Sequence, residues 1–303
     1  MRRLATIAIM LMTVTLPIAP GLGRAQSPPL SAARLQATVE IGPRDVFIYR
    51  YALENGAAST AAIWRMAIDI SLPAGASRPS ASGVAHGPGY FVAELSAGRA
   101  LTTGEPIAVG LSAPQPGWRA TIGTDATARW IAVNDALISP KQRLAGFSLE
   151  SHGPPSIRQF TVAPYIDPQL APVDPPQPDA LEVERYEQEL AEYVESQSVT
   201  GLTLAPSALK AMTPDALLAN LAGQVAQART LRWISNDAAA RNVTDKLQAA
   251  RAAIARRQVD ASRNILGALR TEVAALSGKG FTSEAVALVD VTVQYVLRLL
   301  AKR

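Results

Sequence analysis

Residues 242–300, with the sequence NVTDKLQAARAAIARRQVDASRNILGALRTEVAALSGKGFTSEAVALVDVTVQYVLRLL, decide the fold of the second half of this chain. Apolar side chains recur there every three or four residues, which is the spacing of one face of a helix. They form three successive stripes: Val243, Leu247, Ala250 and Ile254; Ala261, Ile265, Leu269, Val273 and Leu276; Ala285, Leu288, Val289, Thr292, Val296 and Leu299. Each stripe is too narrow to be buried alone, so the three helices must pack on each other or on a neighbour.

Polar residues mark the ends of these helices. We expect Asn242 to cap the first helix and Thr282 to cap the third, because short polar side chains accept hydrogen bonds from the first free amides. Gly278 and Gly280 are expected to end the second helix, since glycine adopts the left-handed conformation that often follows a helix.

Two further helices are expected before this stretch. Residues 181–195 form an acidic segment whose apolar side consists of Leu181, Tyr186, Leu190, Tyr193 and Val194. Residues 201–205 interrupt the helical pattern, and Thr213, Pro214 and Asp215 then give the start signal of another helix. The charges are unevenly distributed: seven acids oppose Arg185 alone in 179–200, whereas eleven bases oppose five acids in 241–303.

The first half of the chain has the pattern of antiparallel strands. Apolar and polar residues alternate from Phe47 to Leu53 and from Trp64 to Ile70, so one face of each strand should be buried. Short apolar runs punctuated by glycine and proline follow, without helical segments between them: 90–95, 107–111, 118–122, 129–133, 144–150 and 157–162. This arrangement favours an antiparallel sandwich over a parallel α/β fold.

A proline-rich segment separates the two halves. Six prolines lie within 163–180, and proline neither donates to a sheet ladder nor fits inside a helix. The sequence therefore predicts an α+β chain of several domains: an immunoglobulin-like β-sandwich at 26–165, a proline-rich linker at 166–180 and an all-α helical bundle at 181–303.

The first 25 residues have the pattern of a signal peptide. Arg2 and Arg3 precede the apolar run 4–18, and cleavage is expected after Ala25. A membrane anchor is the alternative, but Pro17 and Pro20 end the run short of a bilayer span. Removal of this segment takes away three bases and no acid, which leaves a net charge of about +1 from the 29 bases and 25 acids of the whole chain. We expect a periplasmic or extracellular protein, without a later transmembrane segment and without affinity for nucleic acid.

Two parts of the chain resemble domains of exported bacterial proteins. The helical part from about residue 230 onward resembles a FIMAH-type helical domain, and the resemblance implies a binding or spacer role outside the cytoplasm. The residues that carry it are Leu247, Ala250, Ile254, Ala261, Leu266, Leu269, Gly278, Lys279, Thr282, Ala285 and Leu288. The strand region resembles uncharacterised secreted β-sandwich domains, through Pro116-Gly117-Trp118, Trp130, Pro140 and the run 144–148.

The residues with catalytic chemistry do not form a recognisable motif. The chain has no cysteine, which excludes thiol catalysis and cysteine-ligated zinc. Its two histidines, His86 and His152, lie beside glycine and proline, as turn residues commonly do. Ser82 and Ser151 lack the Gly-x-Ser-x-Gly elbow of serine hydrolases. We therefore predict no catalytic residue, no metal site and no cofactor.

Candidate binding residues are aromatic or basic. Trp118 and Trp130 are candidates for a ligand platform, and Trp118 is expected to be partly exposed because it starts a strand. Trp64 shares the strand parity of Met66 and Ile68 and is expected in the core. Four arginines on the helices are candidates for contact with an acidic partner or with the acidic helix 182–195: Arg251, Arg256, Arg257 and Arg263.

The leading hypothesis is an exported, non-catalytic binding protein. Its sandwich would hold a ligand of the cell envelope or the extracellular space, and its helices would engage a macromolecular partner. Two alternatives stay open at this point. One is a cell-envelope hydrolase with carboxylates in the sandwich loops, taken from Asp125, Asp135, Glu105 and Glu150. The other is a structural protein that self-associates through the helical stripes.

Overall fold

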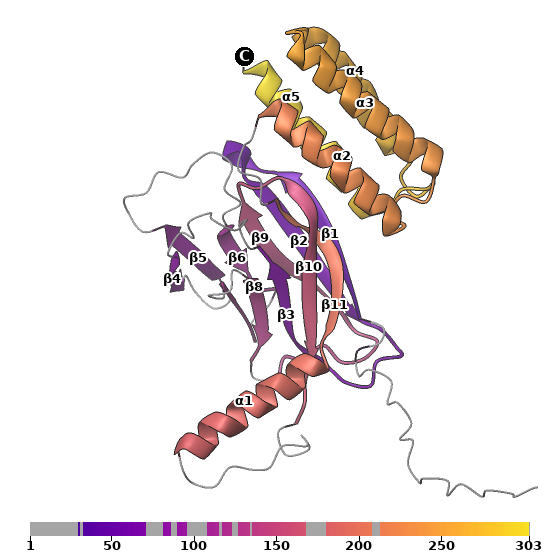
Figure 1. Cartoon of the computed structure of the whole chain (residues 1–303). Coiled ribbons are helices and arrows are strands. Elements are labelled where there is room, and N and C mark those ends of the chain that lie inside the picture. Colours follow the sequence, from indigo (N-terminus) through magenta and orange to yellow (C-terminus); the bar gives the residue numbers. More distant parts are fainter. Residues whose placement is uncertain are drawn as a thin grey trace, which may run out of the picture.

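The computed structural model describes most of the chain between residues 30 and 302 (Figure 1). The described residues are 30, 33–70, 81–85, 90–95, 108–114, 117–122, 127–133, 135–167, 180–207 and 213–302. The predicted signal peptide, most of the predicted linker and His86 lie outside them. No helix among these residues is both long enough and apolar enough to span a bilayer.

Two antiparallel sheets pack face to face as a sandwich, as the alternating pattern predicted. One sheet has the strand order β1-β2-β9-β6-β5-β4 and the other β11-β10-β3-β8-β7. The strands are β1 (Ala33–Ile41), β2 (Phe47–Asn55), β3 (Ile63–Asp69), β4 (Ala81–Ala85), β5 (Tyr90–Leu95), β6 (Ala108–Ser112), β7 (Trp118–Ile122), β8 (Thr127–Ala132), β9 (Arg143–Ser151), β10 (Pro155–Pro164) and β11 (Val199–Pro206). A 3-10 turn, η1 (Pro43–Asp45), joins β1 to β2.

The inner face of β2 forms the centre of the sandwich core. Phe47, Tyr49, Tyr51 and Leu53 alternate along the strand and are all buried, which confirms their predicted face. The two phenols are satisfied inside the core: Tyr49 donates to the Gly153 carbonyl at 2.7 Å and Tyr51 donates to the Leu204 carbonyl at 3.1 Å. Burial raises the pKa of both phenols, so they stay protonated and act as donors.

The predicted orientation of Trp64 is wrong, and a β-bulge is the reason. In the pairing of β3 with β10, Pro164 lies opposite Ile63 and Ala163 opposite Arg65, so Trp64 is an extra residue without a partner. One extra residue shifts the alternation by one position. Ile63 and Met66 are therefore both buried, whereas Trp64 between them is only half-buried.

The helices agree with the sequence pattern, with one correction. They are α1 (Ala180–Ser196), α2 (Pro214–Thr230), α3 (Asp237–Ala255), α4 (Val259–Ala275) and α5 (Ser283–Ala301). Thr213 caps α2, Thr282 caps α5, and Gly278 and Gly280 have positive φ after α4, as expected. Asn242 is not a cap: α3 starts earlier, where Asn236 accepts from the amides of Ala238 and Ala239. Asn242 instead lies within α3 and donates to Glu272 of α4.

The predicted all-helical region 181–303 contains one strand of the sandwich. After α1 the chain returns to pair β11 with β10, from Val199 opposite Val162 to Pro206 opposite Pro155. The interruption at 201–205 is therefore a strand and not a break. Its Gly201 lies opposite Phe160, and a Cβ there would come within 2.6 Å of the Phe160 ring, so only glycine fits.

The helices α2 to α5 pack on the sandwich and share its core. Figure 1 shows α2 and α5 beside β1 and β11, with α3 and α4 forming an outer layer, and α5 contacts β1, β10 and β11. Phe47 of β2 meets Tyr295 of α5 edge to face, with ring centroids 5.0 Å apart. One connected cluster of buried residues runs from the sandwich through α2 to α5. The sandwich and the helical region are thus joined by packing as well as by the chain.

Two polar contacts fix the orientation of the helices on the sandwich. Gln224 of α2 accepts from the Ile157 amide of β10 at 2.7 Å. Asp45 in η1 pairs with Lys302 at 2.8 Å and with Arg298 at 3.4 Å, near the end of α5. The hydrogen bond from Lys302, together with the charges of Lys302 and Arg298, lowers the pKa of Asp45. The contacts of Asp45 join residues that are more than 250 positions apart in the sequence.

Candidate functional site

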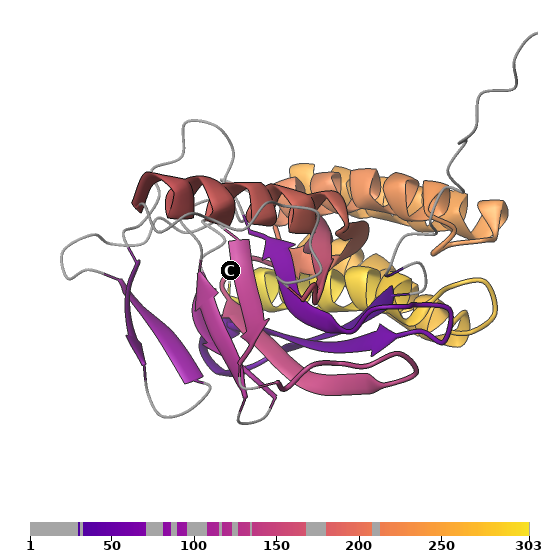
Figure 2. The ribbon, with the colours of Figure 1, turned by 90° about the horizontal axis from the view of Figure 1, so that it is seen from below.

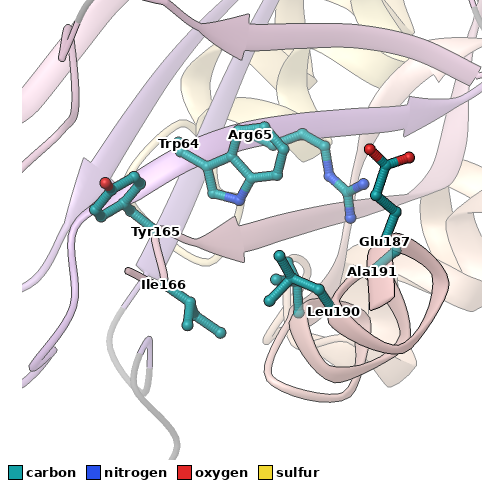
Figure 3. A pocket seen from close by; sticks show the side chains of 8 residues that line it. Trp64, Arg65, Tyr165, Ile166, Glu187, Leu190 and Ala191 are labelled. Carbon is teal, nitrogen blue, oxygen red and sulfur yellow. The ribbon is translucent and has the colours of Figure 1, made fainter. Parts of the chain in front are cut away.

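A pocket lies between α1 and the sandwich, where β3 begins and β10 ends (Figure 3). Its volume is about 350 Å³. Two walls form it. The sandwich contributes Trp64 and Arg65 from β3 together with Tyr165 and Ile166, and α1 contributes Glu187, Leu190, Ala191 and Val194. We call this pocket the α1 groove.

The aromatic wall of the α1 groove depends on the bulge in β3. Because Trp64 is the unpaired residue there, its indole leaves the core and faces the groove. Tyr165 follows Pro164, at the end of β10, and its amide donates to the Ala62 carbonyl at 2.7 Å, which holds the chain beside the start of β3. The side chain of Tyr165 is exposed. Two aromatic rings thus stand at this wall, one at the bulge in β3 and one directly after β10.

The aliphatic wall comes from one stripe of α1. Glu187, Leu190, Ala191 and Val194 are spaced by three or four residues, so they lie on one face of the helix. None of the side chains described on this helix, residues 182–196, is fully buried. The wall is therefore apolar but only loosely covered by the rest of the molecule.

One ion pair connects the two walls. Arg65 of β3 reaches toward α1 (Figure 3). It pairs there with Glu195 at 2.5 Å. The guanidinium carbon of Arg65 also lies 5.6 Å from the centre of the Trp64 ring. The Arg65 side chain is mostly covered, with 23% exposure, whereas Glu195 is 60% exposed. Arg65 therefore brings no uncompensated positive charge to the groove, and Glu187 is the other charged residue that lines it.

The predicted aromatic platform is not on the surface. Trp118 and Trp130 are 1% and 0% exposed, so the expected partial exposure of Trp118 is wrong. Both indoles pack edge to face against Phe147, with centroids 5.1 Å and 6.1 Å away. Trp130 also donates to the Ser112 carbonyl at 2.9 Å. A platform needs an accessible ring face, and these two rings have none.

The four candidate arginines differ in their surroundings. Arg251 on α3 pairs with Asp215 on α2 at 2.8 Å, and this hydrogen bond lowers the pKa of Asp215. Arg263 lies 3.8 Å from Asp260 within α4, and Arg256 donates to Gln258 at 3.2 Å. Arg257 is exposed in the turn between α3 and α4, with φ of 59°. Arg251 thus serves the packing of α3 on α2, and the other three are exposed around the α3–α4 turn.

The acidic helix α1 does not dock on these arginines. Figure 1 shows α1 at the end of the sandwich away from α3 and α4, and its ion pair to the rest of the fold is with Arg65 of β3. Seen from below, α1 crosses the strand ends of the sandwich (Figure 2). The hypothesis that the helix 182–195 binds the basic helices within one molecule is therefore wrong.

The candidate catalytic residues that the structure describes lie on strands and loops of the sandwich. Within the described part of the chain, no group of three or more histidine or acidic side chains is placed to hold a metal ion. Ser151 is buried, and its hydroxyl accepts from the Gly153 amide at 3.0 Å. Glu150 lies on β9 and Asp135 in the β8–β9 loop with φ of 59°. Glu105, Asp125 and His86 lie outside the described residues, and the side chain of Ser82 is not described.

Comparisons with known proteins give no relative for this chain: no family model, no curated protein and no solved structure matches it. The resemblance to FIMAH-type and secreted sandwich domains therefore stays an expectation drawn from the sequence, and the α1 groove is the feature on which a functional conclusion rests.

Proposed function

We propose that this chain is a non-catalytic binding protein and that the α1 groove holds its ligand. The observation that carries the proposal is a pocket of about 350 Å³ lined by two aromatic rings and an aliphatic helix face. Small-ligand sites typically have volumes of about 300–1,000 Å³, apolar walls and a few well-placed polar groups. The α1 groove fits that description with Arg65 and Glu187 as its charged groups.

The two walls differ in rigidity, which suits a binding role. Arg65 is paired on both sides, with Ala163 of β10 and Ile131 of β8, and Trp64 lies between Arg65 and the paired Ile63. This wall is therefore held in place. The opposite wall, α1, has no fully buried side chain among residues 182–196. Helices with few buried contacts open locally at low free-energy cost. A ligand can thus enter by a small displacement of α1 without disturbing the sandwich.

In this proposal the protein acts outside the cytoplasm and uses the helical region as a second contact surface. The export follows from the predicted signal peptide. The candidate surface for a macromolecular partner is the α3–α4 turn, where Arg256, Arg257 and Arg263 are exposed. Arg251 is excluded from it because Asp215 engages its guanidinium.

The binding proposal is tested with an apolar probe. N-phenylnaphthylamine, a neutral fluorescent dye, is titrated against the purified chain and two variants with a new tryptophan. Ala191→Trp fills the groove, whereas Ala249→Trp places the same side chain on an exposed position of α3. We expect saturable binding to the wild type and to Ala249→Trp, and its loss in Ala191→Trp.

Equal dye binding by all three proteins overturns the proposal. Turnover of pooled polysaccharide, ester or peptide substrates does so as well, if Asp135→Asn or Glu150→Gln abolishes it. Circular dichroism of each variant, compared with the wild type, verifies that the fold is retained.

A further inference from the structure

We infer that the ligand of the α1 groove is a basic, amphipathic polypeptide segment. This inference rests on the proposed function, since it assigns a ligand class to the same groove. Its basis is that the walls of the groove are largely apolar and that glutamates of α1 lie along its edge. Apolar side chains of the ligand occupy the groove, and its lysine or arginine residues lie along α1.

The acidic border belongs to the same helix that forms the apolar wall. Six glutamates and a single arginine, Arg185, lie on α1. Glu184 and Glu187 are three residues apart, one turn from each other and next to Ala191 of the groove. Glu184, Glu187 and Glu195 are all exposed. A ligand in the groove is therefore bordered by carboxylates on its α1 side.

The facing wall offsets only part of this negative charge. Among the described residues that line the groove, Arg65 is the one cation, and Glu195 already pairs with it. Arg185, the base on α1, lies 3.8 Å from Glu189. The net field at the groove is thus negative, which attracts cations and repels anionic amphiphiles. The exposed ring of Tyr165 adds a surface on which a cationic side chain can rest.

The shape of the groove favours a polypeptide over a compact cation. Its apolar wall follows the axis of α1 from Glu187 to Val194, and Val183, 38% exposed, extends the same stripe by one turn. Amphipathic helices that bind in grooves present anchors with this spacing of three and four residues. The acids on the border then distinguish a basic segment from a neutral or acidic one.

Two pairs of substitutions separate charge recognition from general acidity. Glu184→Gln with Glu187→Gln removes two charges beside the groove. Glu189→Gln with Glu192→Gln removes two charges from the far face of the same helix. Both double variants change the net charge equally and keep the side-chain size. Glu189 lies 3.8 Å from Arg185, so the second pair also frees that base and serves as a control for charge changes away from the groove.

The probes are three labelled eighteen-residue peptides: an amphipathic leucine–lysine peptide, its leucine–glutamate counterpart and a lysine–serine peptide. Binding to the full chain is measured by fluorescence anisotropy. We expect the leucine–lysine peptide to bind most tightly and Ala191→Trp to abolish its binding. The Glu184/Glu187 pair should weaken it about fivefold, corresponding to two surface ion pairs, and the Glu189/Glu192 pair less than about twofold.

The outcomes distinguish this inference from the proposed function. If the dye binds and is lost in Ala191→Trp, but the leucine–glutamate peptide binds as well as the leucine–lysine peptide, the groove stands and the ligand class is wrong. If the lysine–serine peptide binds equally, and Ala191→Trp has no effect on the peptides, the attraction is to the helix surface and the inference also falls. If neither dye nor peptide binds, both proposals fall.

A second copy of the chain is the other occupant of the α1 groove that must be tested. Its exposed Arg256, Arg257 and Arg263 on the α3–α4 turn would supply the positive charge that the glutamates attract. Light scattering of the wild type over a concentration series tests it. Self-association that Ala191→Trp abolishes overturns the assignment to a separate polypeptide.

Discussion

The helices α1 and α5 are both amphipathic, yet the fold treats them in opposite ways. On α5, nine residues are buried, and Tyr295 packs on Phe47 in the centre of the sandwich. On α1, no side chain among residues 182–196 is fully buried, and the groove remains beside it. An apolar stripe therefore predicts a contact face but not how completely that face is covered. The helix that is covered stabilises the fold, and in our proposal the half-covered one binds the ligand.

The largest expected effect breaks the packing of α5. Phe47→Ala removes a ring that is fully buried between the sandwich and Tyr295 and should lower the free energy of unfolding by about 3–5 kcal/mol. Since one core joins both regions, urea unfolding monitored by circular dichroism and by tryptophan fluorescence should give coincident transitions in the wild type. Two separate transitions would show that the sandwich and the helical region unfold independently.

A smaller effect is expected from the ion pairs at the end of α5. Asp45→Asn should cost about 1 kcal/mol at pH 7, because it removes two partly exposed pairs, with Lys302 and Arg298. The pKa of Asp45 is lowered in the folded protein, so its contribution is present above the ordinary value near 3.8 and is lost as the pH falls through the lowered pKa. Urea unfolding at pH 7 and at low pH measures this difference. A gap between wild type and variant that persists at low pH contradicts the assignment.

On α1, truncation of an apolar side chain should have little effect on the free energy of unfolding of the whole protein. Leu190→Ala is expected to change the free energy of unfolding by less than about 1 kcal/mol, because Leu190 is only partly covered. Hydrogen exchange should at the same time show the α1 amides exchanging faster than those of α5, in the wild type and more so in the variant. Equal protection of the α1 and α5 amides from hydrogen exchange would contradict the expected difference in stability between the two helices.

The smallest effect concerns the ion pair between the groove walls. Glu195→Gln should lower the free energy of local opening of α1 by only about 0.5 kcal/mol at low salt, because Glu195 is 60% exposed and its attraction to Arg65 is screened. The effect should fall further in molar salt, with hydrogen exchange of α1 as the measurement. Thr230→Ala, an exposed position near the end of α2, serves as a control that should leave α1 exchange unchanged.

The candidate site was less predictable from the sequence than the fold. Leu190 and Val194 were assigned to the apolar side of an acidic helix, but their neighbours in the groove come from strand ends. Trp64 was assigned to the core from its parity with Met66 and Ile68. The signal that could have corrected this is Pro164, which cannot continue a strand ladder and lies opposite the bulge. Trp118 and Trp130 failed for a different reason. The position of Trp118 at the start of a strand suggested exposure, but Phe147 of β9 packs against both rings.

The sequence by itself determined most of the elements: strands from alternation and short apolar runs, the helices from their stripes, and several helix ends from Thr213, Thr282, Gly278 and Gly280. These properties are local, because capping, turn conformation and periodicity involve residues a few positions apart. Only the tertiary structure decided that β11 returns to the sandwich after α1, that α5 shares a core with Phe47, and that a bulge turns Trp64 toward α1. Such pairings depend on which surfaces meet between distant parts of the chain. The apolar spacing of a segment is the same whichever surface covers it, so it does not predict them.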